Sequence, residues 1–539
     1  MPTTTIPLVG PYTKRSYGAN ASTKDQRYAG VIFTENQSSG LGQKVIFAEK
    51  RPGLSIDSTP AAGSSAHFVF ASPSKGVRVS GWGTSTSTIY YGTTAQGSAT
   101  EVIGRVMEVV FNSITYFMFV DGQGATAAWY LASDAVSGFT FTGDTHTNTT
   151  IDNVSSLTGL YVGQLLSGTG IAANTRIATI TSPSTITTTL ATTATNAGVT
   201  ITRTGLAKII DADFPASIIG GFAEMDGYLF IATPAGRIYN SDLNSVSSWS
   251  ANNYISSGVE TDQLRSVIRF KNMILGMGVN SIEFYQNSGN PSGSILSRIS
   301  NMTISGVGVR NGVPPMACVQ EDKLYFISTK LAVYVFDGSL RQISSALDSV
   351  FNGTAPYGIY PLNMAQENFI YTSDATSGSA NSQLFSVKTG EWSSFSYAYP
   401  LYMSFDGNGV YAVPATQSVT GGIIYQIVDA PTYIFQDNGV AIQLAIQTEP
   451  KVLNNGKGFK INSIELLADT QSSGATTLEI SRDDYGSFQT LGSFPLTNNR
   501  KRITRGGYCR NHAIFRLTDS GNQAWRGQAI VVDWEPCTV

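Results

Sequence analysis

The chain has 539 residues, of which 13% are charged and 42% are hydrophobic, and its formal net charge at pH 7 is −3. So little excess charge gives no support for a protein that binds nucleic acid over its whole surface, although a local basic patch would be hidden in the sum. The length suffices for about two to four structural units, each able to bury a core. The charged fraction is about half the usual quarter, and abundant Gly, Thr, Ser and aromatic residues indicate an all-β protein with many turns.

The N-terminus and the most apolar window give no targeting or membrane signal. Residues Met1 to Gly10 lack the basic start and apolar core of a secretory signal peptide. The window from Val106 to Val120 is interrupted by Glu108 and Asn112, and it is shorter than the about 20 residues that a transmembrane helix needs. The 3 cysteines are scattered, which argues against a disulfide framework and suits a reducing cytosol. We therefore expect a protein with no membrane span.

The first segment, residues 1–60, is polar and irregular, and we interpret it as an N-terminal arm. It contains a short apolar run, Lys44 to Ala48, and later the pair Pro52-Gly53, which is typical of a turn. Two interpretations are open. The arm crosses or closes the main domain, or it is a partly ordered tail.

Two similar pairs of strands in the middle of the chain set the expected architecture. Asn272 to Gly276 and Asn280 to Tyr285 are apolar runs joined by a short turn that contains glycine, which predicts a β-hairpin. Lys323 to Ser328 and Ala332 to Gly338 repeat the pattern about 50 residues later, the spacing typical of the blades of a β-propeller. The two pairs therefore predict two blades of one ring.

The same pattern recurs on both sides of these hairpins. Runs rich in β-branched and aromatic residues alternate with Asp-Gly and similar turn pairs. One such sheet cannot bury both faces, whereas radial stacking buries them and leaves only short edges. We therefore expect a β-propeller of six or seven blades in residues 61–135 and 205–440, in preference to a sandwich. The runs include His67 to Phe70, Thr115 to Val120, Tyr228 to Ile231 and Gln383 to Val387.

Two further β units interrupt or follow the ring. Residues 136–204 are rich in Thr and nearly free of aromatic residues, and their period-two alternation predicts a small inserted β-sandwich. The glycine-containing phrase from Val162 to Ile180 resembles small all-β modules inserted into or attached to many bacteriophage virion proteins. Residues 441–539 contain several candidate strands, among them Phe459 to Leu467, which predicts a C-terminal β-sandwich-like domain.

A series of motifs lies in a fixed order along the chain. They are Pro7-Leu8, Arg51 to Leu54, Asp242-Leu243, Trp249, Ile268 to Gly276, Ser281 to Tyr285, Gly289, Gly306 to Gly308, Tyr325 to Ser328, Ile480 to Gly486, Arg500 to Arg502 and Phe515 to Leu517. In their order and spacing they resemble the packaged-DNA stabilisation protein, or tail nozzle (tail hub), family of short-tailed bacteriophages. The resemblance spans most of the chain outside residues 136–204, which the family pattern does not require.

The resemblance implies a fold, an assembly and a place in the virus particle. It implies a six-bladed propeller, a hexameric ring below the portal and head-to-tail adaptor proteins, and a central channel that double-stranded DNA passes without sequence specificity. Tail fibre, spike or needle proteins are its other implied neighbours. The implied function is that of a structural protein of the virion tail, made in the host cytoplasm, which retains packaged DNA until ejection. We expect no cofactor, no metal ion and no enzymatic activity.

The densest positive stretch comprises Arg500, Lys501 and Arg502, followed by Arg505 and Arg510. If several subunits present it toward a channel or a neighbour, these side chains would contact DNA phosphates or an acidic partner surface. The alternative, which we prefer, is a solvated hairpin with alternating outward arginines. DNA in a conduit has to be held loosely, so a weakly charged lining is compatible with a nozzle.

A second function class is a carbohydrate-binding or glycan-cleaving propeller that recognises a receptor. Cleavage needs a carboxylate pair at a suitable separation, and nothing in the sequence places two candidates together. Sugar binding would use aromatic platforms, although core packing is the commoner use of such residues. The candidate carboxylates are Glu224, Asp226, Glu260, Asp262 and Glu283, and the candidate platforms are Trp82, Trp129 and Tyr254. Of the carboxylates, Glu283 is expected to make a structural hydrogen bond.

Two remaining features are expected to be structural. The segment from Ser481 to Phe488 is close to the Asp-box turn of sialidase-like propellers, with one extra residue before the glycine, and such a turn positions a hairpin. His67, His146 and His512 have no Cys or carboxylate at metal-ligand spacing, so each is expected at the surface or in a hydrogen bond.

Overall fold

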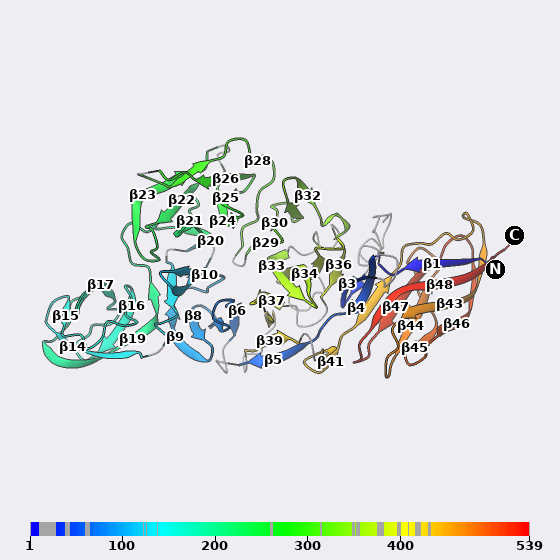
Figure 1. Ribbon diagram of the computed structural model, residues 1–539, viewed down its shortest axis with the longest axis horizontal. Helices are drawn as coiled ribbons and strands as arrows, with labels where there is room; N and C mark the ends of the chain where they lie inside the picture. The colour runs from blue at the N-terminus through cyan, green and yellow to red at the C-terminus, as the bar shows by residue number, and fades with distance from the viewer. Residues whose placement is uncertain are drawn as a thin grey trace.

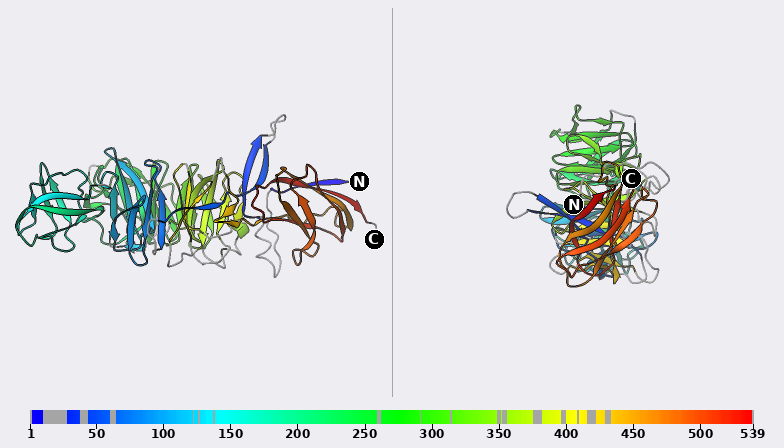
Figure 2. Two further views of the ribbon diagram at one scale, coloured as in Figure 1. Left: turned by 90° about the horizontal axis from the view of Figure 1, so that it is seen from below. Right: turned by 90° about the vertical axis from the view of Figure 1, so that its right-hand side faces the viewer.

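The computed structural model shows three β units in a row (Figure 1). The inserted module lies at one end, the ring of blades in the middle, and the C-terminal sandwich at the other end, where both chain termini also lie (Figures 1 and 2). No helix among the described residues is long and apolar enough to cross a membrane. The described residues are 2–9, 28–37, 44–59, 65–121, 123–125, 127–136, 138–258, 262–290, 292–312, 315–347, 351, 356–374, 382–395, 400–407, 409–414, 422–428 and 433–537.

Seven antiparallel sheets follow one another round the ring, so the expected β-propeller is confirmed. The first strand of each blade is the innermost, and it lies beside the first strand of a neighbouring blade. The family resemblance implied six blades, whereas the described strands form seven, the larger of the two counts expected from the sequence.

The blades follow the order of the chain. Blade one contains β6 (Ala66–Ala71), β7 (Arg78–Trp82), β8 (Ser87–Tyr91) and β9 (Thr94–Ala99). Blade two contains β10 (Arg105–Phe111), β11 (Ile114–Val120), β13 (Trp129–Ala132) and the end of β19 (Asn196–Lys208). Blade three contains β20 (Ile218–Met225), β21 (Tyr228–Ala232), β22 (Arg237–Ser241) and β23 (Trp249–Ser256), with β12 (Gln123–Ala125) beside β20.

The remaining blades repeat this arrangement. Blade four contains β24 (Leu264–Phe270), β25 (Met273–Gly278), β26 (Ser281–Asn287), β27 (Leu296–Arg298) and β28 (Ile304–Ser305). Blade five contains β29 (Ala317–Gln320), β30 (Lys323–Ile327), β31 (Val333–Phe336) and β32 (Leu340–Gln342), and the 3-10 turn η1 (Ser345–Leu347) follows it. Blade six contains β33 (Pro356–Met364), β34 (Glu367–Asp374), β35 (Gln383–Ser386) and β36 (Trp392–Ser394). Blade seven contains β37 (Pro400–Phe405), β38 (Val410–Pro414), β39 (Ile424–Ile427) and β5 (Leu54–Ser58).

Several hairpin turns place two successive residues in the left-handed region, the geometry that matches the twist of paired strands. Asn112-Ser113 has φ values of 49° and 67°, and Asp226-Gly227 has 56° and 83°. Glu321-Asp322, with 48° and 56°, and Ala365-Gln366, with 51° and 62°, adopt the same geometry. Asp226-Gly227 is a pair that predicts such a turn from sequence, whereas Ala365-Gln366 is not, so the paired strands impose it.

A strand from the N-terminal arm closes the ring. β5 is antiparallel to β39 at the outer edge of blade seven, with Leu54 opposite Ile427 and Ile56 opposite Tyr425. The first and last parts of the propeller therefore share one sheet. Opening the ring between blades seven and one would leave this pairing intact but would break the core packing between β6 and β37.

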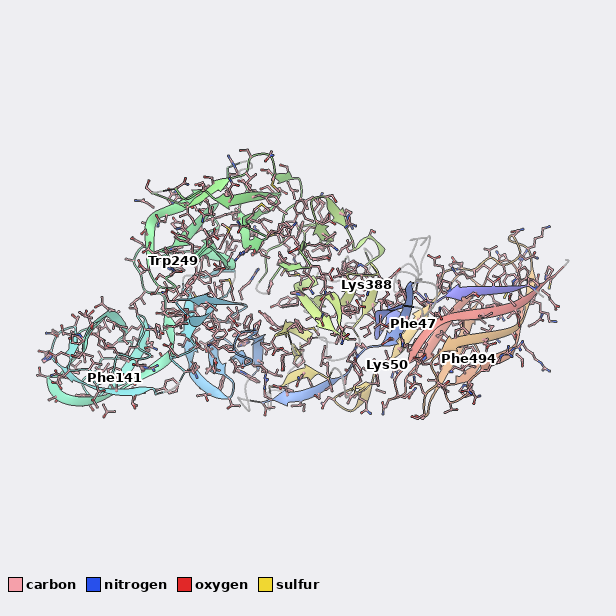
Figure 3. The ribbon with its side chains drawn as sticks, viewed as in Figure 1. Phe47, Lys50, Phe141, Trp249, Lys388 and Phe494 are labelled. Atoms are coloured by element: carbon pink, nitrogen blue, oxygen red, sulfur yellow. The ribbon has the colours of Figure 1, made fainter. Side chains whose placement is uncertain are left out.

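The inserted module interrupts blade two within β19, whose first residues pair with the module and whose last residues pair with β13. A bridge between Leu165 and Arg176 brings the two remaining edge strands together, so the six strands close around an apolar core that includes Phe141 (Figure 3). The module was expected to be a small β-sandwich, and its six strands form such a unit with the two sheet edges joined. They are β14 (Thr140–Thr145), β15 (Thr150–Asp152), β16 (Gln164–Gly168), β17 (Ile177–Thr181), β18 (Thr185–Thr188) and the start of β19.

The C-terminal unit packs two sheets around a core that contains Phe459, Phe494 and Trp525 (Figure 3). The first sheet has the order β3-β4-β48-β43-β46, with β1 also on β48, and the second contains β42-β47-β44-β45. The strands of the first are β1 (Thr3–Pro7), β3 (Val31–Gln37), β4 (Lys44–Lys50), β43 (Phe459–Ala468), β46 (Lys501–Cys509) and β48 (Arg526–Pro536). Those of the second are β42 (Leu444–Gln447), β44 (Ala475–Ser481), β45 (Gln489–Pro495) and β47 (Ile514–Asp519).

One sheet runs from the propeller into the sandwich. β2 (Tyr28–Ala29) is parallel to β36 at Ala29 and antiparallel to β42, which gives a continuous sheet of nine strands. Beside it, Lys388 Nζ lies 2.8 Å from both Glu35 Oε2 on β3 and Glu367 Oε1 on β34 (Figure 3). The N-terminal arm therefore joins two units through backbone and side-chain bonds.

Candidate functional site

The basic residues predicted as a contact site lie on β46 and immediately on either side of it, in the sandwich. Two of them are neutralised by acidic partners. Arg500 Nη2 lies 2.8 Å from Glu465 Oε2, and Arg502 Nη2 lies 3.1 Å from Asp533 Oδ2. The structure thus brings the predicted residues together on one edge strand, but these two arginines already have counter-charges.

Lys501 is a framework residue, which corrects its assignment to a contact surface. It is 2% exposed, and its Nζ donates to Ala468 O at 3.0 Å and to Asn498 O at 2.9 Å. Burial lowers the pKa of its amine. An approaching phosphate would have to replace these carbonyl acceptors, so Lys501 is not available to one.

Arg505 and Arg510 remain as exposed cations. Neither makes an ion pair with another residue in the described part of the chain. Arg505 has a φ of +80°, which is uncommon for a residue other than glycine. The uncompensated charge of the predicted site therefore resides in these two side chains.

A cavity at the centre of the propeller was not expected from the sequence. Its volume is about 350 Å³, and the inner strands β10, β20 and β24 and the segment from Pro315 to Val319 line it. Its charged lining residues are Arg105, Glu108, Glu224 and Arg269. The first strand of each blade faces the propeller axis. Knowing which strand begins each blade would therefore have identified the residues that line this cavity.

Arg105 is the most buried of these charges, at 7% exposure. Its Nη2 donates to Gly312 O at 3.1 Å. Burial lowers the pKa of the guanidinium to about 10, so it remains charged at neutral pH. Burial also raises the pKa of the nearby hydroxyls of Tyr360 and Tyr402, which therefore stay protonated.

The predicted carboxylates serve the framework where the structure describes them. Glu224 Oε2 lies 2.9 Å from Arg269 Nη1, Asp226 accepts from Asn287 Nδ2 at 2.8 Å, and Asp262 accepts from Ser281 Oγ at 3.0 Å. Glu260 lies outside the described residues.

Glu283 makes the structural hydrogen bonds expected of it. It is 1% exposed, and it accepts from Gly258 N at 3.0 Å and from Tyr285 Oη at 2.8 Å. Arg298 Nη1 lies 3.4 Å away. That prediction is confirmed, and burial raises the pKa of Tyr285, so its hydroxyl remains a donor.

The aromatic residues considered as sugar platforms do not all face solvent. Trp82 and Trp129 are each 1% exposed and belong to the propeller core, so that assignment is wrong for both. Tyr254 lies 5.1 Å from Tyr239 between ring centroids, and the guanidinium of Arg237 lies 4.4 Å above its ring.

The Asp-box-like segment is a turn between β44 and β45 in the sandwich. Asp483 Oδ1 accepts from Ser481 Oγ at 2.8 Å and from Ser487 N at 2.9 Å, and Oδ2 accepts from Ser487 Oγ at 2.6 Å. These bonds to Ser487 and Ser481 lower the pKa of Asp483 to about 2. The prediction of a structural turn is confirmed.

The histidines form no metal-ligand group with other described residues. His146 Nε2 lies 2.9 Å from Asp152 Oδ1 in the inserted module, and burial lowers the pKa of His67. His146 is therefore in a hydrogen bond, as expected.

No family model matches the chain, and no curated protein matches it. Among solved structures it is similar to the WD40 β-propeller domain of Doa1, with a TM-score of 0.35 and 9% identity over 70% of this chain and 96% of that one. It is also similar to the computationally designed Ika8 protein, with a TM-score of 0.34 and 10% identity over 70% and 100%. An exo-β-1,3-galactanase from Phanerochaete chrysosporium has a TM-score of 0.24 and 13% identity over 58% and 95%. Because these TM-scores are low, the assignment of the propeller fold is based on the strand pairing of this chain alone.

Proposed function

We propose that the chain is a structural virion protein, a tail nozzle whose copies form a ring that extends the DNA channel below the portal and adaptor. Closure of that ring retains packaged DNA until ejection. The support is the ordered series of motifs, most densely from Asp242 to Ser328, where β25, β26 and β30 form the blades expected there. The activity is assembly, and the chain acts without turnover.

DNA would pass between subunits and not through one propeller. The cavity on the propeller axis has a volume of about 350 Å³, which is the size of a small-molecule site. The space around the cavity is occupied by the buried side chains of Arg105, Tyr360 and Tyr402. A conduit for a double helix therefore needs several copies of the chain around a common axis.

The observation that carries the proposal is the elongated form of the subunit, in which the propeller and the sandwich share one sheet. The sheet that starts in blade six continues through β2 into the sandwich, so the two units share backbone hydrogen bonds. The two ends of the molecule are formed by different units, the inserted module at one and the sandwich at the other (Figure 2). Such a subunit suits head-to-tail contacts that close into a ring by rotation.

The weak charge of the subunit suits loose passage of DNA. Arg500 and Arg502 are paired with Glu465 and Asp533, which leaves Arg505 and Arg510 as exposed cations of that strand. Each phosphate contact adds affinity that ejection has to overcome. A wall with few unpaired cations offers less resistance to the moving duplex.

The mass of the purified protein, alone and mixed with the adaptor–portal ring, tests this proposal. The proposal predicts a ring, formed by the chain itself or on the adaptor. A chain that stays monomeric and never joins the adaptor would overturn it.

A further inference from the structure

A cleft at the junction of the propeller and the sandwich has the form of a ligand site. Its volume is about 440 Å³, within the range of small-molecule pockets. The start of β5 forms one wall, the segment from Tyr433 to Gly439 forms the other, and Asn522 of the sandwich completes it. That segment includes β40 (Gln436–Asp437) and leads into β41 (Val440–Ala441). The cleft shares no lining residue with the cavity around Arg105.

No charged side chain lines this cleft among the described residues. The lining residues with polar side chains are Ser55, Tyr433, Gln436, Asn438 and Asn522. Phosphates, carboxylates and metal ions are recognised by opposite charges, which the cleft does not offer. Its chemistry instead fits a neutral ligand with many hydroxyl groups.

The amides and the serine hydroxyl of the lining are available to such a ligand. The side chains of Ser55, Gln436, Asn438 and Asn522 make no hydrogen bond with another described residue. An amide group presents two donors and an acceptor with two lone pairs, and a hydroxyl both donates and accepts. A sugar hydroxyl has the same dual character, so the two sets are complementary.

Aromatic and aliphatic groups supply the apolar side of the cleft. The rings of Tyr433 and Phe435 are nearly parallel, with centroids 6.3 Å apart and an angle of 25° between planes. Tyr433 is 41% exposed and Ile56 is 48% exposed. An exposed ring face beside free amides combines an apolar surface with polar groups that fix orientation, the pattern of small-ligand sites.

The walls of the cleft are held in place before any ligand arrives. Gly53 N donates to Ile434 O at 2.8 Å, and a Cβ at Gly53 would lie 2.0 Å from Gln436 O, so only glycine fits there. Leu54 N donates to Asp437 Oδ1 at 3.1 Å. Because these bonds join both walls, binding needs little ordering of the protein.

We propose that this cleft binds a neutral carbohydrate, with a sugar ring against Tyr433 and its hydroxyls on the amides of Gln436, Asn438 and Asn522. The site is complete within one subunit, so it is independent of ring formation. Failure of the chain to form a ring would leave it unaffected.

A glycan array that carries neutral and acidic oligosaccharides, probed with the full-length protein, tests the proposal. The strongest neutral glycan is then titrated calorimetrically into the wild type and into the Tyr433→Ala and Asn522→Ala variants. Tyr508→Ala is the matched control, because Tyr508 is 47% exposed and lies on β46, away from the cleft.

The proposal predicts binding to neutral glycans, a loss of affinity of about tenfold or more for each cleft variant, and no change for the control. Circular dichroism would verify that all variants are folded. Silence across the array, binding confined to acidic glycans, or equal affinity of Tyr433→Ala and the wild type would each overturn it.

Discussion

Arg51 Nη1 donates to Asp437 Oδ1 at 2.9 Å, which joins the N-terminal arm to the segment that follows blade seven. Both side chains are 1% exposed, and the guanidinium lies 4.0 Å from the ring centroid of Phe395. Next to it, Lys50 forms a buried ion pair with Asp519 of the sandwich and donates to Gly521 O at 2.8 Å. Arg51 therefore ties the arm to the segment after blade seven, and Lys50, at the end of β4, ties the two sheets of the sandwich together.

Removing one partner of the Arg51 pair is expected to destabilise the protein strongly. Asp437→Ala would leave a buried guanidinium uncompensated, at a cost of about 3–5 kcal/mol. Denaturant unfolding measures this, with Asp533→Ala, which breaks the more exposed pair with Arg502, as the control. Equal stability of the two variants would contradict the role given to Asp437.

Glu283→Gln is expected to lower the stability of blade four. The carboxylate accepts hydrogen bonds from Gly258 N and Tyr285 Oη in a buried site. In the variant, the amide NH2 of the glutamine would point at one of these donors, and the lost hydrogen bond would cost about 1–3 kcal/mol. Glu224→Gln, the same substitution at a partly exposed pair with Arg269, is the control. An unfolding midpoint for Glu283→Gln that matches the control would show that these hydrogen bonds do not matter.

Asp483 is expected to make stability depend on pH in the acid range. Its pKa is lowered from 3.8 to about 2 in the folded protein, so its contribution is present above pH 3.8 and is lost as pH falls toward 2. The difference in unfolding midpoint between the wild type and Asp483→Asn should shrink through this window. A difference that stays constant from neutral pH to pH 2 would contradict the assignment.

The exposed cations of the basic strand are expected to carry any contact with DNA. In a ring bound to a short duplex, the double variant Arg505→Ala/Arg510→Ala should reduce the slope of log K against log salt by about 0.9 for each phosphate that the arginines no longer neutralise. Arg500→Ala/Arg502→Ala should change the slope less, because Glu465 and Asp533 already neutralise those arginines. Equal slopes for the two double variants would contradict this division.

Local sequence patterns predicted much of the fold. The runs from Asn272 to Tyr285 contain β25 and most of β26, and Phe459 to Leu467 matches β43, because alternating apolar residues and Gly-containing turns specify such strands. The structural role of Glu283 followed from its place inside an apolar strand. These strands and the role of Glu283 could therefore be predicted from short stretches of sequence.

The pairings between distant segments could not be predicted. β5 closes blade seven beside β39, and β2 joins β36 to β42, through hydrogen bonds between residues far apart in sequence. The burial of Lys501 depends on the pairing of β46 with β43, and the position of Arg105 depends on how the blades pack round the ring, so neither was predicted. The junction cleft was missed for the same reason, since β5, Tyr433 and Asn522 meet only in the fold.

Electron cryomicroscopy of the intact virus particle would show directly whether this chain forms the tail nozzle. A tail nozzle would appear as several copies of this seven-bladed propeller, with its inserted module and sandwich, around the tail axis below the portal and adaptor. Density for the chain in a peripheral fibre, or its absence from the tail, would contradict a nozzle function.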